Sequence, residues 1–354
     1  MEHRQNFKVR DGEEGDTEKI LSLRKIVMGE FEEDKLDPKF WKWEFAGGPD
    51  GDAFIYIIEE EKRIIGHFAD IPRRFSVKGK TVKGTLSLDL MVHPDYWRRG
   101  FFFKMGTYAA RKVKEENGRF MIAFPIREET IDGLKKIGWH AVNDLPVIAY
   151  PVRFHGIVNR YLHFLPLSIL VGGMARFFYS FFFFGKGKRG AGIEIDEVKV
   201  LDDAFDLFWQ KAASSHSILG VRDTSFLTWR YVRHPSRHYT LFGAKKNGEM
   251  RGYIVLRKVE LLKFNSMIIV DLLALEDETV RALVEKGIEY SREKGTDLLG
   301  CILPKGHRYF RILRKRGFLP GFKSFLFMVY PTVDEKILID PKEWYVNWGD
   351  SDVV

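Results

Sequence analysis

The sequence predicts an α/β fold built twice along the chain, each copy being a mixed, mostly antiparallel, twisted sheet flanked by helices. Two observations predict it: an ordered internal repeat, and an alternation of strand-like and helix-like patterns within each repeat. The length of 354 residues also exceeds what one typical core accommodates. A hydrophobic content of 45% beside 30% charged residues is typical of a globular protein.

The repeat is visible as a series of matches in the same order. The segment FWKWEF, which begins at Phe40, matches FLTWRY 186 positions later. AFPIREETIDGLKKIGW matches ILPKGHRYFRILRKRGF at a spacing of 179. Both copies close on a Tyr-Pro pair, at Tyr150 and at Tyr330. One match could arise by chance, but the ordered series indicates two copies of one fold.

Each copy is expected to contain the same elements in the same order. A helix opens the copy and a tryptophan-bearing helix follows; three strands, a long helix, a strand, a short helix ending at a glycine, and a last strand complete it. In the first copy we expect these elements at 17–31, 38–45, 53–59, 63–71, 86–92, 101–117 and 120–125, then a helix ending at Gly138. In the second copy we expect them at 203–214, 225–232, 239–245, 251–259, 267–275, 277–294 and 298–303, then a helix ending at Gly317.

These patterns predict a first domain over residues 1–153 and a second over residues 192–354, joined by an apolar connector over residues 154–191. The connector is rich in phenylalanine and is expected to be helical. Three interpretations of it stay open. It packs on the two copies, it anchors at a membrane surface through residues 161–189, or it spans a bilayer. Arg176 and the Gly172-Gly173 pair argue against spanning.

Charge and cysteine content narrow the setting further. The formal net charge of +8 suits an anionic ligand or surface, but basic residues are spread along the chain, so no nucleic acid is expected as a partner. Cys301 is the single cysteine, which excludes an intrachain disulfide and fits a reducing compartment. The polar opening stretch lacks the pattern of a secretory signal. We therefore expect a cytoplasmic location, with contact at the membrane surface as a second option.

The most informative stretch is VHPDYWRRGFFFKM, where a strand ends and a helix begins. The first turn of a helix leaves backbone N–H groups unpaired, and these donors, together with the helix dipole, favour an anion. Gly100 lets a phosphate approach the backbone closely, and Arg98 and Arg99 supply positive charge and directed donors. The alternative is an ordinary strand-to-helix turn with exposed arginines.

This stretch resembles the acetyl-coenzyme A motif of the GNAT N-acetyltransferase superfamily, V-x-P-x-Y-[RQ]-x-x-G-x-[GA]. Val92, Pro94, Tyr96 and Gly100 fall on its positions, and FPIREETIDGLKKIGW resembles the motif that follows it. The resemblance implies acetyl-coenzyme A as co-substrate, with no metal. It also implies that the strand backbone pairs with the pantetheine arm and that the loop cradles the pyrophosphate. The implied binding residues are Met91, Val92, Arg98, Arg99, Gly100, Phe101, Phe102, Phe103 and Lys104.

The sequence departs from the two motifs in three places. Trp97 stands where the family has Arg or Gln, and Phe102 stands where it has a small residue. Leu134 occupies the position of the tyrosine that often protonates the leaving thiolate. The second copy has LALEDETVRALV at the loop, where acidic residues would repel a pyrophosphate, so we expect it to bind no coenzyme A and to help select the acceptor.

Three residues are candidates for the base that accepts the amine proton. Asp89 lies within a strand, where partial burial would raise the pKa of its carboxyl. The alternative for Asp89 is a structural salt bridge. His67 is expected on the acceptor side of the sheet, and His93 lies in the turn before the loop.

The function that follows from the resemblance is transfer of an acetyl group from acetyl-coenzyme A to a small-molecule primary amine, of an amino sugar or a cell-envelope precursor. Two alternatives stay open. One is an aminoacyl or long-chain acyl transferase of the tandem type, and the other is a binding protein without turnover. The sequence does not fix the acceptor or the oligomeric state.

Overall fold

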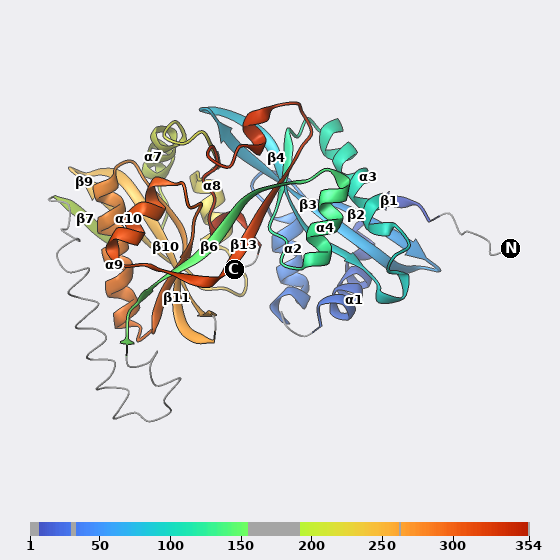
Figure 1. Ribbon diagram of the computed structural model, residues 1–354, viewed down its shortest axis with the longest axis horizontal. Helices are drawn as coiled ribbons and strands as arrows, with labels where there is room; N and C mark the ends of the chain where they lie inside the picture. Colours follow the sequence, from blue (N-terminus) through green and yellow to red (C-terminus); the bar gives the residue numbers. More distant parts are fainter. Residues whose placement is uncertain (1–6, 30–32, 155–191, 262, 353–354) are drawn as a thin grey trace, which may run out of the picture. The chain divides into compact units, whose positions relative to one another are not determined.

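The computed structural model describes residues 7–29, 33–154, 192–261 and 263–352, which form two compact units (Figure 1). The first unit consists of Met1–Asn143, Thr228–Arg237 and Leu326–Glu343, and the second of Asp144–Leu227, His238–Phe325 and Trp344–Val354. The predicted apolar connector lies, from residue 155 onward, outside the described residues. No helix in the described part of the chain is both long enough and apolar enough to cross a membrane.

In the first unit the strand order is β1-β2-β3-β4-β5-β13. The bounds of these strands are Val9–Asp11 (β1), Phe54–Glu60 (β2), Arg63–Val77 (β3), Lys80–Val92 (β4), Phe120–Ala123 (β5) and Leu319–Pro331 (β13). Neighbouring strands are antiparallel except β4 and β5, which run parallel. The mixed sheet expected from the alternation of strands and helices is therefore present.

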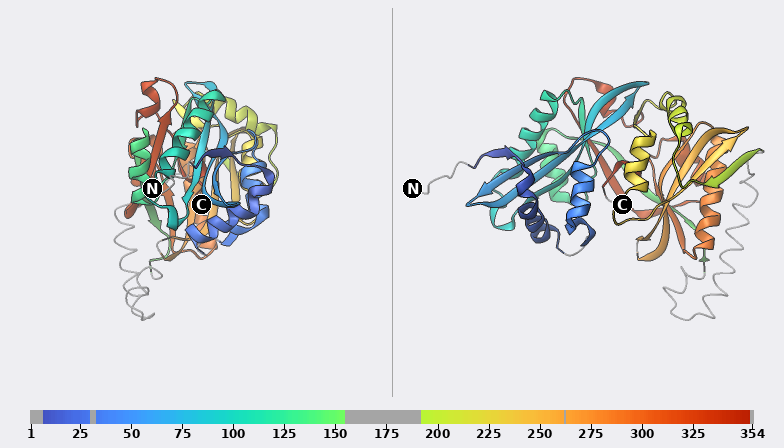
Figure 2. Two further views of the ribbon diagram at one scale, coloured as in Figure 1. Left: turned by 90° about the vertical axis from the view of Figure 1, so that its right-hand side faces the viewer. Right: turned by 180° about the vertical axis from the view of Figure 1, so that it is seen from behind.

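Four α-helices cover the two faces of this sheet: α1 (Thr17–Met28), α2 (Pro38–Ala46), α3 (Phe101–Glu115) and α4 (Glu128–Ile137). Alternate residues of β3 point to opposite faces. The backbone of Gly66 lies against Met105 of α3, whereas the ring of His67 lies against Trp41 and Phe45 of α2. Helices α1 and α2 thus lie on one face, and α3 and α4 on the other (Figure 2).

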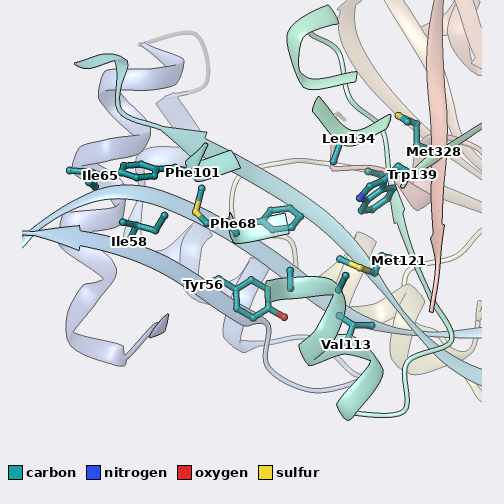
Figure 3. Close-up of a cluster of buried hydrophobic side chains, with 14 residues drawn as sticks. Tyr56, Ile58, Ile65, Phe68, Phe101, Val113, Met121, Leu134, Trp139 and Met328 are labelled. Carbon is teal, nitrogen blue, oxygen red and sulfur yellow. The ribbon is translucent and has the colours of Figure 1, made fainter. Parts of the chain in front are cut away.

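A hydrophobic core lies between α3 and the sheet and holds the start of α3, which follows the loop after β4. Phe101, Met105, Ala109 and Val113 form the buried stripe of α3, at the three-to-four-residue spacing of an amphipathic helix. They pack against apolar side chains of β2, β3, β5 and α4, many of which are drawn in Figure 3. The start of α3 is therefore held in place by a fully packed core.

In the second unit the strand order is β6-β12-β11-β10-β9-β7. The bounds are His140–Pro151 (β6), Leu298–Ile302 (β12), Phe264–Ala274 (β11), Glu249–Leu261 (β10), Thr240–Lys246 (β9) and Ile193–Glu197 (β7). The helices of its sequence range are α7 (Asp203–Ala213), α8 (Thr224–Leu227), α9 (Asp277–Glu293) and α10 (Arg308–Arg316). Only β11 and β12 are parallel neighbours among these described strands, as are β4 and β5 in the first unit.

The two copies exchange their last strands. Strand β6 follows the first copy in sequence, yet its end pairs with β12, with Tyr150 opposite Leu299. Strand β13 follows the second copy, yet its end pairs with β5, with Tyr330 opposite Met121. The compact units therefore differ from the sequence ranges 1–153 and 192–354, because each copy's last strand completes the other copy's sheet.

Most predicted elements are confirmed within a few residues. Gly138 and Gly317 end α4 and α10 with φ angles of 112° and 111°, the left-handed geometry that glycine adopts without strain. Two differences are informative. Strands β3 and β4 extend to a turn at Lys78 and Gly79, well beyond the predicted bounds. The single helix expected at 225–232 is instead a short α-helix followed by a π-helical turn, Thr228–Val232.

Candidate active site in the first unit

The loop between β4 and α3 leaves the start of the helix open to solvent. A 3-10 turn, Pro94–Tyr96, ends β4, and Arg98 and Gly100 then adopt left-handed φ angles of 63° and 79°. No described side chain caps the helix, whose first main-chain bond runs from Lys104 N–H to the Gly100 carbonyl. A Cβ atom placed on Gly100 would meet no described atom within 4 Å. The first N–H groups of α3 are thus available to an external acceptor.

The three phenylalanines after Gly100 do not block this opening. Phe101 is buried in the core, with its ring 5.0 Å from the ring of Phe7. Phe102 turns toward α4, where a Cβ atom on Gly133 would lie 2.6 Å from its ring. Phe103 is 53% exposed on the outer side of the helix. Gly133 therefore makes the room that the departure at Phe102 requires, a compensation that the sequence analysis missed.

An open strand edge leads to this helix start. Strand β4 pairs with β5 at Thr85 and Leu86, and in the described chain its pairing with β5 extends no further. Beyond that point β4 remains paired with β3. The two parallel strands therefore separate, which leaves one edge of residues 87–92 without a strand partner among the described residues.

Backbone alternation shows which main-chain groups face the open edge. His93 N–H bonds to the Ile65 carbonyl of β3 at 2.8 Å, so Met91, two residues earlier, also faces β3. The N–H and carbonyl of Val92 point the other way, toward the open edge. Of the two residues predicted to pair with a pantetheine arm, Val92 has its main chain free of β3, and Met91 does not.

Trp97 occupies part of this edge. Its indole Nε1 donates a hydrogen bond to the Val92 carbonyl at 2.8 Å, while the ring as a whole is 59% exposed. Trp97 stands where the family motif has Arg or Gln. The indole thus bonds a carbonyl of β4 that would otherwise be offered to a ligand.

The charge at the loop is positive. Arg98, Arg99 and Lys104 are all exposed, and the Arg99 guanidinium lies 4.8 Å from the ring centre of Tyr96. Lys104 Nζ donates to the main-chain carbonyl of Phe7 at 3.3 Å. These cations surround the helix N-terminus, so charge and main-chain donors favour the same kind of ligand, a phosphate.

Asp89 lies at a bulge of β4 and is engaged in a buried ion pair. Its φ of 53° is unusual for a non-glycine residue and coincides with the register shift between β3 and β4. Its carboxylate accepts a hydrogen bond from the buried Arg24, which also binds Glu44 Oε2 at 3.2 Å and the Lys35 carbonyl at 2.6 Å. These contacts agree with the second interpretation of Asp89 given above, a structural salt bridge rather than a catalytic base.

His67 is completely buried, and only one of its ring nitrogens is satisfied. Nδ1 lies 2.9 Å from the Asp89 carbonyl and must donate to it, which leaves Nε2 as a bare acceptor. Nε2 has no hydrogen-bond partner in the described part of the chain. Burial, and then the nearby Arg24 charge, hold the pKa of His67 well below its usual value, so the ring is neutral.

His93 is buried as well, but both of its ring nitrogens face donors of the chain. Nδ1 accepts from the main-chain N–H of Asp95 at 3.3 Å, and Nε2 contacts the Arg63 guanidinium. His93 therefore caps the 3-10 turn before the loop. Its contacts are those of a residue that shapes the turn.

The second copy repeats the buried aspartate. Asp271 matches Asp89 in the repeat, and its Oδ2 accepts from Arg222 Nε at 2.8 Å. Arg222 also binds Asp350 at 2.8 Å, and Asn347 binds the other oxygen of Asp271 at 2.8 Å. Each copy thus pairs this aspartate with a buried arginine, although the arginines come from different parts of the chain.

The open edge of the first copy is closed in the second. Ala274, which matches Val92, bonds through both its N–H and its carbonyl to the Tyr309 hydroxyl, at 2.9 and 2.7 Å. The Tyr345 hydroxyl bonds the Leu272 carbonyl, and Tyr345 and Trp348 of the C-terminal segment are buried. Side chains of the second copy therefore occupy the strand edge that corresponds to the open edge of β4 in the first copy.

The acidic loop of the second copy, by contrast, is neutralised by the chain itself. Glu276 pairs with Arg251, and Glu278 pairs with Lys246 at 2.7 Å. The repulsion expected from these acids is therefore weaker than their sequence predicts. Tyr309 and Tyr345, which occupy the strand edge, are the stronger reason to expect no coenzyme A in this copy. The sequence does not indicate this role, because the two tyrosines lie far apart in the chain.

Among the described residues no group of three His, Cys, Asp or Glu side chains is arranged to hold a metal ion. Cys301 is buried, and burial raises the pKa of its thiol.

Comparisons with known proteins bear on the same part of the chain. Residues 8–142 match the family model described as an acetyltransferase (GNAT) domain. None of the curated proteins compared matches the chain.

Solved structures extend the likeness over nearly the whole chain. A GCN5-related N-acetyltransferase from Anabaena variabilis ATCC 29413 is similar with a TM-score of 0.68 and 12% identity, over 94% of this chain and 74% of that one. A probable N-acyltransferase from Enterococcus faecalis V583 gives 0.66 and 10%, over 93% and 73%. A tandem GNAT protein from the clavulanic acid biosynthesis pathway gives 0.55 and 13%, over 93% and 100%. At these identities the likeness shows the fold, and the predicted fold is confirmed.

Proposed function

We propose that the chain transfers an acetyl group from acetyl-coenzyme A to a primary amine of a small molecule, because residues 8–142 match the model of the acetyltransferase (GNAT) domain. The observation that carries the proposal is the open edge of β4, which ends at the exposed N-terminus of α3 beside Gly100. An amino sugar or a cell-envelope precursor is the acceptor class that we propose, following the family resemblance.

Each part of the junction has a role in this proposal. The N–H groups at the start of α3, with Arg98 and Arg99, would hold the diphosphate. The main chain of Val92 would bond the pantetheine arm, and its N–H would polarise the thioester carbonyl. The thioester supplies the activated acetyl group, and alignment of the amine against it supplies much of the rate.

We assign the proton-accepting role to His67 rather than to Asp89 or His93. The carboxylate of Asp89 is bound to Arg24, and both nitrogens of His93 face donors of the chain. His67 keeps one bare nitrogen among the described contacts and is neutral, so Nε2 can accept a proton, while its lowered pKa makes it a weaker base than a solvent-exposed histidine. His67→Gln should lower kcat by at least tenfold with little change in the KM for acetyl-coenzyme A, since the diphosphate cradle is untouched.

A matched pair of glycine variants tests the cofactor site. Gly100→Glu places a negative side chain in the cradle, whereas Gly79→Glu makes the same change in the β3–β4 turn. Gly79 has a similar φ of 77° and equally open surroundings, so the backbone strain is matched. Coenzyme A should raise the melting temperature of the wild type and of Gly79→Glu, and should leave that of Gly100→Glu unchanged. A wild type without any shift would overturn the proposal.

A binding protein without turnover is the second candidate, and Leu134 favours it. Leu134 is buried in the core at the position of the family's thiolate-protonating tyrosine, so no hydroxyl is offered there. Thiol release from acetyl-coenzyme A across a panel of primary amines separates the two candidates. Coenzyme A binding without release for any amine would favour the second.

A further inference from the structure

A basic groove lies between α9 and α10 in the second unit, far in sequence from the β4–α3 junction. Its cavity has a volume of about 360 Å³. The side chains of Val284 and Ile312, both largely buried, form its floor. Five basic side chains and two acidic ones line the rest: Arg281, Arg308, Arg311, Lys315, Arg316, Asp277 and Glu285.

The acidic side chains of the groove are already engaged. Glu285 binds Arg316 through both carboxylate oxygens. Asp277 lies 3.9 Å from Arg281 and 4.0 Å from Arg308, a loose pairing with two cations. These contacts hold Arg316 in place and leave an excess of positive charge.

Arg311 and Lys315 provide that excess. They lie one turn apart on α10, both point away from the packed core, and neither forms an ion pair with any of the described residues. Arg308 is oriented by a hydrogen bond from its Nη2 to the Ala274 carbonyl at 3.2 Å. Burial, and then the charges of His216, Arg308 and Arg311, lower the pKa of the adjacent His307.

The helix itself does not account for this charge. Arg308 and Arg311 lie in the N-terminal half of α10, where the helix dipole favours acidic side chains. The first copy follows that rule, with Glu129 and Asp132 at the matching positions of α4. The second copy has arginines at both positions, where the helix dipole alone would favour acids.

We propose that the α9–α10 groove is a second anion site, which binds a phosphate-bearing ligand through Arg281, Arg308, Arg311 and Lys315. Guanidinium groups from two helices suit the oxygens of a phosphate or diphosphate, and Lys315 adds a point charge. The cavity exceeds the size of a single phosphate, so a diphosphate or a phosphorylated molecule fits it. The site is distinct from the proposed acetyl donor site and does not depend on it.

A phosphate group that binds this groove could belong to a free phosphorylated molecule or to a phospholipid headgroup. The experiment tests each source separately. Inorganic diphosphate is titrated into the full-length protein by calorimetry. Phosphatidylglycerol vesicles are tested by co-sedimentation, with phosphatidylcholine vesicles as the neutral control. Both are repeated with Arg311→Glu/Lys315→Glu and with Lys62→Glu/Lys199→Glu, which changes the net charge equally at exposed positions outside the groove.

Measured in the Gly100→Glu background, which removes the proposed donor cradle, binding in either arm should weaken at least tenfold in the groove variant and should persist in the control variant. That pattern assigns the ligand to the groove even if the acetyl donor proposal fails. Binding that the groove variant retains but Gly100→Glu loses would overturn the groove site, as would no binding in both arms. Arg311→Gln/Lys315→Gln, a milder change, should give an intermediate loss and guards against misfolding of the double charge reversal.

Discussion

Trp43 and Trp229 each donate the indole N–H to the other's main-chain carbonyl, at 3.0 and 3.1 Å, with their rings stacked 5.0 Å apart. The two residues occupy matching positions of the repeat, 186 residues apart. The pair is thus unchanged when the two copies are interchanged. The repeat that is visible in the sequence thus corresponds to a symmetric pair of hydrogen bonds in the structure.

Replacing either tryptophan by phenylalanine should cost a similar amount. Each change removes one hydrogen bond, worth about 1 kcal/mol, and alters a stack worth about 1 kcal/mol. We expect Trp43→Phe and Trp229→Phe to lower the free energy of unfolding by about 1 to 2 kcal/mol each, measured by denaturant titration. The double variant should lose less than the sum, because the two residues share one interaction. Strict additivity would mean that the two indoles do not act as a unit.

Asp89→Asn should reduce stability more than it alters the pH dependence of the reaction. Removing one charge from a buried ion pair costs about 3 to 5 kcal/mol, and Arg24 would lose its closest carboxylate. Asp271→Asn is the matched variant in the second unit, where Arg222 would lose a partner. We expect comparable losses of melting temperature in the two variants. A pH–rate profile that changes shape for Asp89→Asn alone would instead identify Asp89 as the base.

Asp70 makes the stability of the first unit depend on pH. The carboxyl is fully buried between β3 and β4, and burial raises its pKa to about 6 from the ordinary 3.8, even though Ser87 and Thr85 donate to it. Since the folded state holds the proton more tightly than the unfolded chain, the favourable contribution is present below pH 3.8 and is lost as the pH rises through 6.

Asp70→Asn removes that titration and should therefore stabilise the protein at neutral pH. The difference in pKa corresponds to about 3 kcal/mol at full ionisation. In urea titrations between about pH 4 and pH 8, the stability of the variant relative to wild type should increase with pH and level off above about pH 7. A difference that stays constant across this range would show that Asp70 does not titrate near 6.

Trp97→Phe should tighten the binding of coenzyme A if the proposed site is correct. The indole of Trp97 bonds the Val92 carbonyl, and a ligand that needs this carbonyl must first displace it. Loss of one such hydrogen bond, about 1 kcal/mol, corresponds to about fivefold in the dissociation constant, measured by calorimetry. Leu207→Ala, at an exposed position of α7 outside the proposed site, is the control. Weaker binding in Trp97→Phe would show that the indole contacts the ligand.

The sequence predicts local structure well where one residue decides it. Gly138 and Gly317 end their helices as expected, and the strand-to-helix junction at Gly100 forms as predicted. The sequence did not predict contacts between residues that lie far apart in the chain. Arg24 lies 65 residues from Asp89, and no periodicity links the two, so the structural role of Asp89 stayed one alternative among others.

The strand exchange was equally hidden, because the ends of β6 and β13 carry the same Tyr-Pro pair. Tyr150 and Tyr330 take equivalent positions opposite the strands they complete, so either strand could serve either sheet. Only the three-dimensional pairing distinguishes the two arrangements. The same holds for Trp97, whose hydrogen bond to Val92 depends on the turn between them.

The crossed strands also bear on any attempt to divide the protein. A break placed between residues 154 and 192 would yield two polypeptides. Each would carry the last strand of the other half's sheet, and each sheet would be left with an unpaired edge. Neither fragment would be a self-sufficient module, and the two should co-purify as a reconstituted pair. Crystallisation trials and activity assays that aim at one half should therefore keep both halves together.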